Sequence, residues 1–134
     1  MLKLIGCLPA LCLSAGAFAG TVIYTDSTHP VFNTPSDTPI IFLDTPDRLQ
    51  AELFGPLPSD AAQAEKQAHE LLVSPSFKTR ERQLAGAYQG VIKAWSLGLE
   101  KYPAVVFDDK WVVYGTTDVG LATQQMNAWR EANQ

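Results

Sequence analysis

The chain has 134 residues, of which 46% are hydrophobic, and its 10 basic and 14 acidic residues give a net charge of −4. No run of lysine or arginine is present to follow a phosphate backbone, so we expect no direct binding to nucleic acid. The length suits one hydrophobic core and is too short for two comfortable ones.

The first 19 residues have the pattern of a secretory signal peptide. Lys3 supplies a positive start, residues 4–13 are mostly apolar, and residues 17–19 (Ala-Phe-Ala) show the small-x-small pattern read by signal peptidase. The apolar run is too short to span a bilayer. We therefore expect cleavage before Gly20, a single mature domain over residues 20–134, a periplasmic location and no stable membrane span after cleavage.

Both cysteines lie in that N-terminal segment, at Cys7 and Cys12. The mature protein is therefore expected to contain neither a disulfide nor a Cys-x-x-Cys redox centre. Its two histidines, His29 and His69, are far apart in the sequence, which argues against a metal site. We expect no cofactor.

The first half of the mature chain predicts two strands and a helix. Residues 21–25 and 40–43 have the composition of buried strands, and the Ser, Thr, Asp and Pro residues of 26–38 predict a loop between them. Thr45 and Pro46 mark a helix start, with the threonine hydroxyl as N-cap and proline at the first helical position. The stretch 55–58 (Gly-Pro-Leu-Pro) ends this helix.

Two more helices are predicted before the next strand. Asp60 begins one of them with a capping box, and this helix runs to about Val73. A longer helix is expected over residues 77–99. Its large apolar residues recur at helical spacing and predict a buried stripe, made of Leu84, Tyr88, Val91, Ile92, Trp95 and Leu99.

After Pro103 the pattern predicts a β-hairpin and a closing helix. Residues 104–107 and 111–114 are strands, and Asp108 and Asp109 are expected to serve the turn, a catalytic carboxylate pair being the weaker alternative. Asp118 is expected to cap the last helix, whose apolar face is Val119, Ala122, Met126 and Trp129.

The aromatic residues Trp111 and Tyr114 are expected on opposite faces of their strand, because side chains alternate along a strand. Helices covering both faces would bury both side chains, whereas an edge position would expose one of them. The order of strand, loop, strand, helices, hairpin and helix predicts an α/β domain. Its core is a four-stranded mixed sheet with helices on both faces.

This order resembles a thioredoxin-like domain whose first helix is reduced to the loop 26–38. In that fold a cis-proline begins the first hairpin strand and faces the redox motif that follows the first strand. Pro103 stands at the position of that proline, and residues 25–30 (Thr-Asp-Ser-Thr-His-Pro) stand in place of the motif. No cysteine is present there, so the resemblance implies the fold without redox activity.

Four groups of segments carry a second resemblance. They are Tyr24-Thr-Asp with His29-Pro30, Ile41-Phe-Leu-Asp44 with Arg48-Leu49, Ala87-Tyr-Gln-Gly90 with Ala94-Trp-Ser-Leu-Gly98, and Pro103-Ala-Val-Val with Val113-Tyr-Gly-Thr and Asp118-Val. In these segments the chain resembles a family of small exported proteins of unknown molecular function, encoded by integrating conjugative elements of Gram-negative bacteria. The resemblance implies a periplasmic role in mating-pair formation or type IV secretion. We expect an accessory or assembly protein that binds periplasmic conjugation and secretion proteins, and not an enzyme.

The loop after the first strand holds the best candidate for chemistry. The imidazole of His29 can bind or titrate near neutrality, although a role in ordering the turn is the preferred interpretation. With Asp26, Pro30, Pro103 and Asp118 it forms a candidate binding surface for a peptide or a partner strand. The alternative functions are a thiol-independent isomerase, a chaperone that grips extended peptides at Pro103, and a hydrolase using His29. No catalytic or metal-binding residue is assigned.

Overall fold

The protein is described by a computed structural model that covers residues 20–134. The predicted signal peptide and both cysteines lie outside the described residues. The elements are, in chain order, β1 (Thr21–Thr25), β2 (Ile40–Phe42), α1 (Thr45–Phe54), α2 (Ala61–Leu72), α3 (Phe77–Ser96), β3 (Ala104–Phe107), β4 (Trp111–Tyr114) and α4 (Val119–Ala132).

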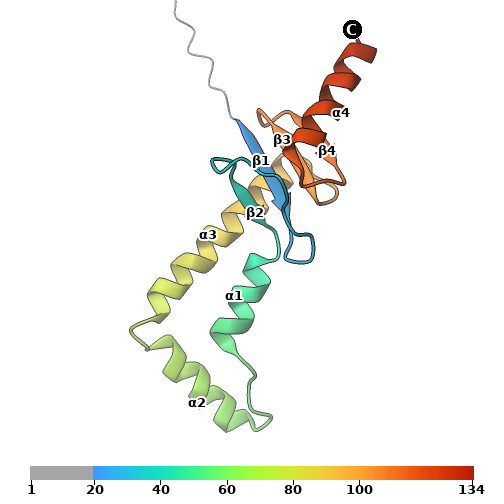
Figure 1. The fold of residues 1–134 in the computed structure, drawn as a ribbon. Helices are drawn as coiled ribbons and strands as arrows, with labels where there is room; N and C mark the ends of the chain where they lie inside the picture. Colours follow the sequence, from blue (N-terminus) through green and yellow to red (C-terminus); the bar gives the residue numbers. More distant parts are fainter. Residues whose placement is uncertain (1–19) are drawn as a thin grey trace, which may run out of the picture.

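The four strands form one mixed sheet in the order β2-β1-β3-β4 (Figure 1). β1 pairs in parallel with β2 and antiparallel with β3, and β3 pairs antiparallel with β4. The predicted α/β architecture with a four-stranded mixed sheet is confirmed. The connection between β1 and β2 is irregular, as its polar composition predicts.

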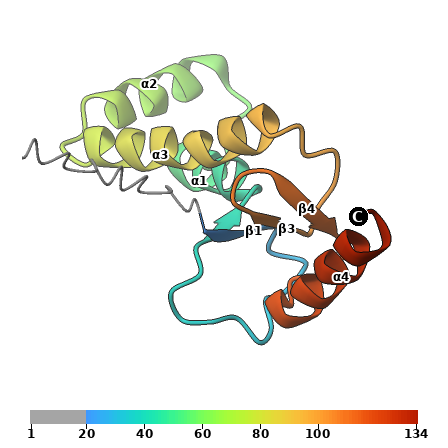
Figure 2. The ribbon, with the colours of Figure 1, turned by 90° about the horizontal axis from the view of Figure 1, so that it is seen from above.

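Helices lie on both faces of the sheet, α4 on one side and the other three helices on the other (Figure 2). On the α4 side, Ile23 and Val105 pack with Ala122 in a fully buried cluster. On the α3 side, Tyr24 and Val106 pack with Ala94. Neighbouring residues of one strand belong to different clusters because side chains alternate between the two faces of a sheet. The protein therefore has two small cores, one on each face of the sheet.

Thr45 is not the N-cap of α1, in contrast to the prediction. The helix already includes Thr45, and the residue before it is Asp44, whose side chain makes no capping hydrogen bond. The Asp44 carboxylate instead accepts hydrogen bonds from the hydroxyl and the main-chain N–H of Ser27, in the loop after β1. These bonds hold the pKa of Asp44 below its ordinary value, and the bond from the hydroxyl has the larger effect. A long-range contact has thus replaced the local cap.

The end of α3 also differs from the prediction, because the helix stops at Ser96 and not at Leu99. Gly98 adopts a φ of 71°, which is the left-handed region that glycine enters without steric cost. Its N–H donates to Trp95 O (2.9 Å), and the N–H of Leu99 donates to Ala94 O (3.1 Å). This pair of bonds is a Schellman motif, so the glycine is the stop signal.

The predicted buried stripe of α3 is correct only in part. Leu84, Val91 and Leu99 are half-buried, but Trp95 is 82% and Ile92 53% exposed, and Tyr88 is exposed as well. Ala94 is the fully buried residue of this helix. One residue turns a helix by about 100°, so Trp95, directly after Ala94, faces solvent. The helix packs on the sheet through small residues. A Cβ added at Gly90 would lie 2.6 Å from Cγ2 of Ile41 on β2.

Helix α2 begins as predicted. Asp60 is its N-cap and accepts a 2.9 Å hydrogen bond from the N–H of Gln63. None of its residues is fully buried, and it lies beyond the sheet, where a turn joins its end to the start of α3 (Figure 1). His69 is exposed on this helix, as expected.

The C-terminal hairpin and helix match the prediction with two refinements. Trp111 and Tyr114 do lie on opposite faces, but β4 is an edge strand and Tyr114 is 37% exposed. Asp108 and Asp109 form the turn with positive φ angles of 53° and 52°. Trp129 lies on the apolar face of α4 but is half exposed. Within residues 20–134, no helix is both long and apolar enough to cross a bilayer.

Candidate functional site

Three of the five predicted site residues, His29, Pro30 and Pro103, line a shallow hollow at one end of β1 and β3. The hollow has a volume of about 270 Å³ and is lined by residues of the loop after β1, by Pro103, and by residues 115–117 after β4. His29 lies beside the residue before Pro103, since its ring is 6.2 Å from that of Tyr102, centre to centre. The peptide bond between Tyr102 and Pro103 is cis, and Pro103 O accepts a 2.9 Å hydrogen bond from the N–H of Gly115. The structure therefore brings the loop and the proline together, as the sequence predicts.

Asp26 organises the loop after β1. Its Oδ1 atom accepts hydrogen bonds from the main-chain N–H groups of Thr28 (3.1 Å) and His29 (3.0 Å), and from the Thr28 hydroxyl (2.8 Å). A carboxylate that captures the N–H groups two and three residues ahead is a common way to close a turn. The main role of Asp26 is thus structural. It does not line the hollow, but it contacts His29, which does.

The side chain of His29 also binds Asp26. The distance from its Nδ1 atom to Oδ1 of Asp26 is 2.6 Å, and the histidine side chain is 48% exposed. This hydrogen bond is the largest of the effects that hold the pKa of Asp26 below its ordinary value. An ionised carboxylate only accepts hydrogen bonds, so Nδ1 carries the proton. In the neutral form of the ring, Nε2 is then the acceptor.

Two buried threonines hold the main chain of the loop. The hydroxyl of Thr25, at the end of β1, donates to His29 O (3.1 Å), and that of Thr117 donates to Pro30 O (3.0 Å). Both threonines are buried polar residues. Sequence reasoning missed them because threonine occurs in strands and loops for many reasons. The one signal was the position of each, directly beside Asp26 and Asp118.

Asp118 is joined to the same loop from the side of α4. It caps α4 by accepting the N–H of Leu121 (3.0 Å), and its second oxygen accepts from Asn33 Nδ2 (3.1 Å). These bonds lower the pKa of Asp118, and the capping bond has the largest effect. Asp118 does not line the hollow itself. Through Asn33 it anchors the middle of the segment between β1 and β2. Of the five predicted site residues, Asp26 and Asp118 are therefore anchors, and the other three line the hollow.

Two of the hydroxyl groups around the hollow already donate hydrogen bonds, that of Thr28 to Asp26 and that of Thr117 to Pro30 O. The Thr116 hydroxyl accepts from the N–H of Asp118 (3.0 Å), which leaves its own O–H able to donate. The side chains left to a ligand are therefore the His29 ring, the proline rings, the exposed Phe32 and the Thr116 hydroxyl. Within the described part of the chain, no group of three or more histidine, cysteine, aspartate or glutamate residues is placed to hold a metal ion.

Comparison with known proteins places the chain in a family. Residues 18–132 match the family described as "Protein of unknown function (DUF1525)". The chain belongs to this family. No curated protein and no solved structure matches it. The matched range includes every residue of the hollow and all four strands, so the architecture described above is that of the DUF1525 region itself.

Proposed function

We propose that this DUF1525 protein is an exported accessory or assembly protein of an integrating conjugative element, and that it acts by binding other proteins and not by redox catalysis. Its partners in this proposal are periplasmic proteins of the conjugation and type IV secretion apparatus. The signal-peptide pattern of residues 1–19 supports export. The resemblance of the sequence to exported proteins of such elements supports the setting.

The exposed face of α3 is the observation that carries a binding role. Tyr88, Ile92 and Trp95, here called the α3 ridge, are spaced by four and three residues and so lie on one side of the helix. Trp95 has 82% of its surface exposed to solvent. Tryptophan and tyrosine dominate the energetics of protein interfaces, and clustered exposed apolar side chains mark interaction sites. The ridge is therefore the surface that we expect a partner to cover.

We also propose that the fold is thioredoxin-like. The strand order β2-β1-β3-β4, with β3 antiparallel to its neighbours, supports this assignment. Further support comes from the place of Pro103 directly before β3, where it lines the same hollow as His29 and Pro30 of the loop after β1. A solved structure of the mature protein, superposed on thioredoxins, would test it.

Site-specific cross-linking tests the partner. A photoreactive amino acid in place of Trp95, in the host strain during mating, is expected to cross-link the protein to a component of the transfer apparatus. The same amino acid in place of Gln67, exposed on α2, serves as the control. Cross-links from both positions to the same unrelated proteins, or from neither, would contradict a specific contact at the α3 ridge.

A genetic experiment tests the setting. Deletion of the gene is expected to lower the frequency of conjugative transfer, and the wild-type gene supplied in trans is expected to restore it. Trp95→Ala should restore it poorly while retaining the circular dichroism spectrum of the folded protein. Normal transfer in the deletion strain would refute the role in conjugation.

The Asp26–His29 pair supports a second candidate function. A histidine whose Nδ1–H is held by a carboxylate presents Nε2 as a general base, which is the arrangement found in many hydrolases and isomerases. In this alternative the residues around Pro103 hold an extended substrate and His29 activates a water molecule. His29→Ala would then abolish the biological activity, whereas Trp95→Ala would leave it intact. The opposite pattern favours the binding role.

A further inference from the structure

The edge strand β4 has main-chain groups that β3 does not use. The N–H of Gly115 donates to Pro103 O, so this pair belongs to the hydrogen-bonded positions of the β3–β4 ladder. Such positions alternate along antiparallel strands, which makes Val113 and Trp111 the next residues bonded to β3. The N–H and C=O groups of Val112 and Tyr114 therefore point away from β3, to the free edge of the sheet.

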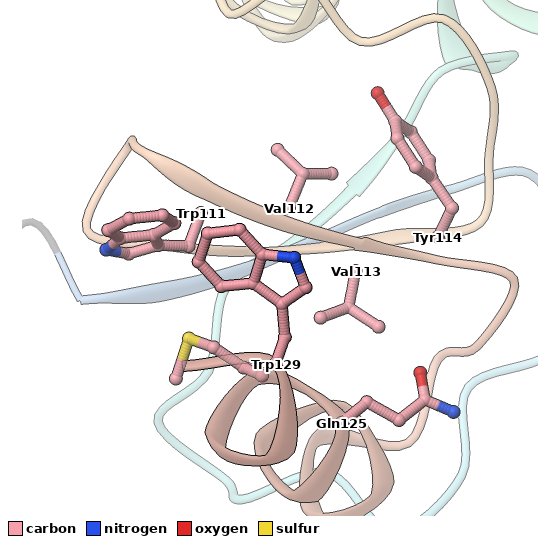
Figure 3. Close-up of a pocket in the computed structure, with 7 residues that line it drawn as sticks. Trp111, Val112, Val113, Tyr114, Gln125 and Trp129 are labelled. Carbon is pink, nitrogen blue, oxygen red and sulfur yellow. The ribbon is translucent and has the colours of Figure 1, made fainter. Parts of the chain in front are cut away.

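A groove runs along this edge (Figure 3). The groove has a volume of about 390 Å³ and is lined by residues 111–114 of β4 and by Gln125, Met126 and Trp129 of α4; we call it the β4–α4 groove. The rings of Trp111 and Trp129 lie side by side with their centroids 5.5 Å apart, and Tyr114 lies at the other end. The groove thus joins apolar side chains to a row of free main-chain donors and acceptors.

Three cations flank the groove. Lys110 Nζ and the Arg130 guanidinium lie 4.9 Å and 5.3 Å from the centre of the Trp111 ring, and Lys101 Nζ lies 5.8 Å from that of Tyr114. The ion pairs within residues 20–134 involve other side chains, so no described carboxylate pairs with these three. Three of the ten basic residues of an acidic chain therefore lie beside the two ends of β4, Lys110 and Arg130 by Trp111 on the α4 face and Lys101 by Tyr114 on the opposite face.

We propose that the β4–α4 groove binds an extended segment of a partner protein that carries acidic residues at both ends and adds to the sheet beside β4. Its main chain bonds the free groups of Val112 and Tyr114, its apolar side chains pack on Trp111 and Trp129, and its carboxylates meet the cations. A second copy of this chain fits less well. Antiparallel pairing of two β4 strands brings Lys110 and Arg130 of one copy against Lys101 of the other.

This surface is separate from the α3 ridge and from the His29 hollow, which are built on other residues. A binding measurement on the purified mature protein does not involve conjugation. Its failure is therefore distinguishable from a failure of the proposed role in transfer.

Synthetic peptides test the proposal with fluorescence anisotropy. The probe is a fluorescein-labelled peptide of alternating valine and threonine flanked by glutamate pairs. We expect saturable binding that weakens with added salt. A peptide flanked by lysine pairs should bind at least about tenfold more weakly, as should the glutamate peptide with N-methyl groups on alternate amides, which cannot complete the strand.

Variants locate the binding site. The double change Lys110→Glu with Arg130→Glu should weaken the binding of the glutamate peptide by at least about tenfold. Trp129→Ala should weaken the binding of the glutamate peptide and of the lysine peptide. Lys66→Glu and Leu72→Ala, on the exposed surface of α2, are the matched controls and should leave the affinity unchanged. Circular dichroism on each variant checks that it is folded.

Several results would overturn the proposal. They are the absence of saturable binding by the glutamate peptide, equal binding of the lysine or the N-methylated peptide, and unchanged binding by the charge-reversed variant. A dimer seen by sedimentation that dissociates in Trp129→Ala would assign the groove to a second copy of the chain and would also overturn it.

Discussion

Thr117 Oγ1 donates a 3.0 Å hydrogen bond to the carbonyl oxygen of Pro30, 87 residues away in the sequence. The bond joins the segment before α4 to the loop after β1. It lies beside the predicted site residues His29 and Pro103. The geometry of the hollow therefore depends on a contact between two segments that are far apart in the sequence.

Removal of this hydroxyl is predicted to destabilise the protein. Thr117→Val keeps the shape of the buried side chain but leaves Pro30 O without its donor, which costs about 1–3 kcal/mol in the free energy of unfolding. Urea unfolding monitored by tryptophan fluorescence measures this change. Thr117→Ser retains the hydroxyl and is the control, and equal losses in the two variants would show that the hydrogen bond is unimportant.

The two glycines in the middle of α3 are predicted to respond oppositely to alanine. Gly86 has open space around it, so Gly86→Ala should raise the free energy of unfolding by about 0.5–1 kcal/mol through better helix propensity. At Gly90 the new methyl group would lie 2.6 Å from Ile41, so Gly90→Ala should lower it by about 1–3 kcal/mol. Thermal unfolding of both variants decides the matter. A stabilised Gly90→Ala variant would mean that α3 does not pack closely on β2.

Two isoleucines test which residues form the core. Ile23 is fully buried on β1, and Ile23→Ala should destabilise the protein by about 2–5 kcal/mol. The same substitution at Ile92 on the α3 ridge should change stability by no more than about 0.5 kcal/mol, since this side chain is already largely exposed. Chemical denaturation of the pair gives the comparison. A large loss at Ile92 would restore the buried stripe predicted from the sequence.

Three aspartates are predicted to make the fold sensitive to acid. Hydrogen bonds from His29, Ser27 and Leu121 lower the pKa values of Asp26, Asp44 and Asp118, respectively, from the ordinary 3.8. The folded state then binds fewer protons than the unfolded state. The stabilisation is therefore fully present above about pH 5 and is lost as pH falls through the folded pKa values, below about pH 4.

The variant Asp118→Asn isolates one of these contributions. It should be less stable than the wild type at neutral pH, and the difference should shrink as pH falls below about 4, because the wild-type carboxylate becomes protonated. Urea unfolding at a series of pH values measures the difference. A gap that stays constant down to pH 2 would show that the Asp118 carboxylate has the same pKa in both states.

Local patterns predicted the elements of this protein well. The β-branched runs indicate the four strands, Asp60 and Asp118 indicate two helix starts, and both caps are made by hydrogen bonds within three residues. The turn at Asp108 and Asp109 is local in the same way. Each of these features depends on neighbours in the sequence, so periodicity and residue type are sufficient to find them.

The sequence by itself determined the order of the strands and helices, the caps at Asp60 and Asp118, and the position of Pro103 before a hairpin. Only the tertiary structure decided that α3 packs through Ala94 and Gly90 and leaves Trp95 exposed, and that Thr25 and Thr117 hold the His29 loop. A helical stripe shows which residues share a face, but it does not show how closely the helix approaches the sheet. The closest approach favours small side chains, and a hydrogen bond across 87 residues leaves no periodic pattern in the sequence.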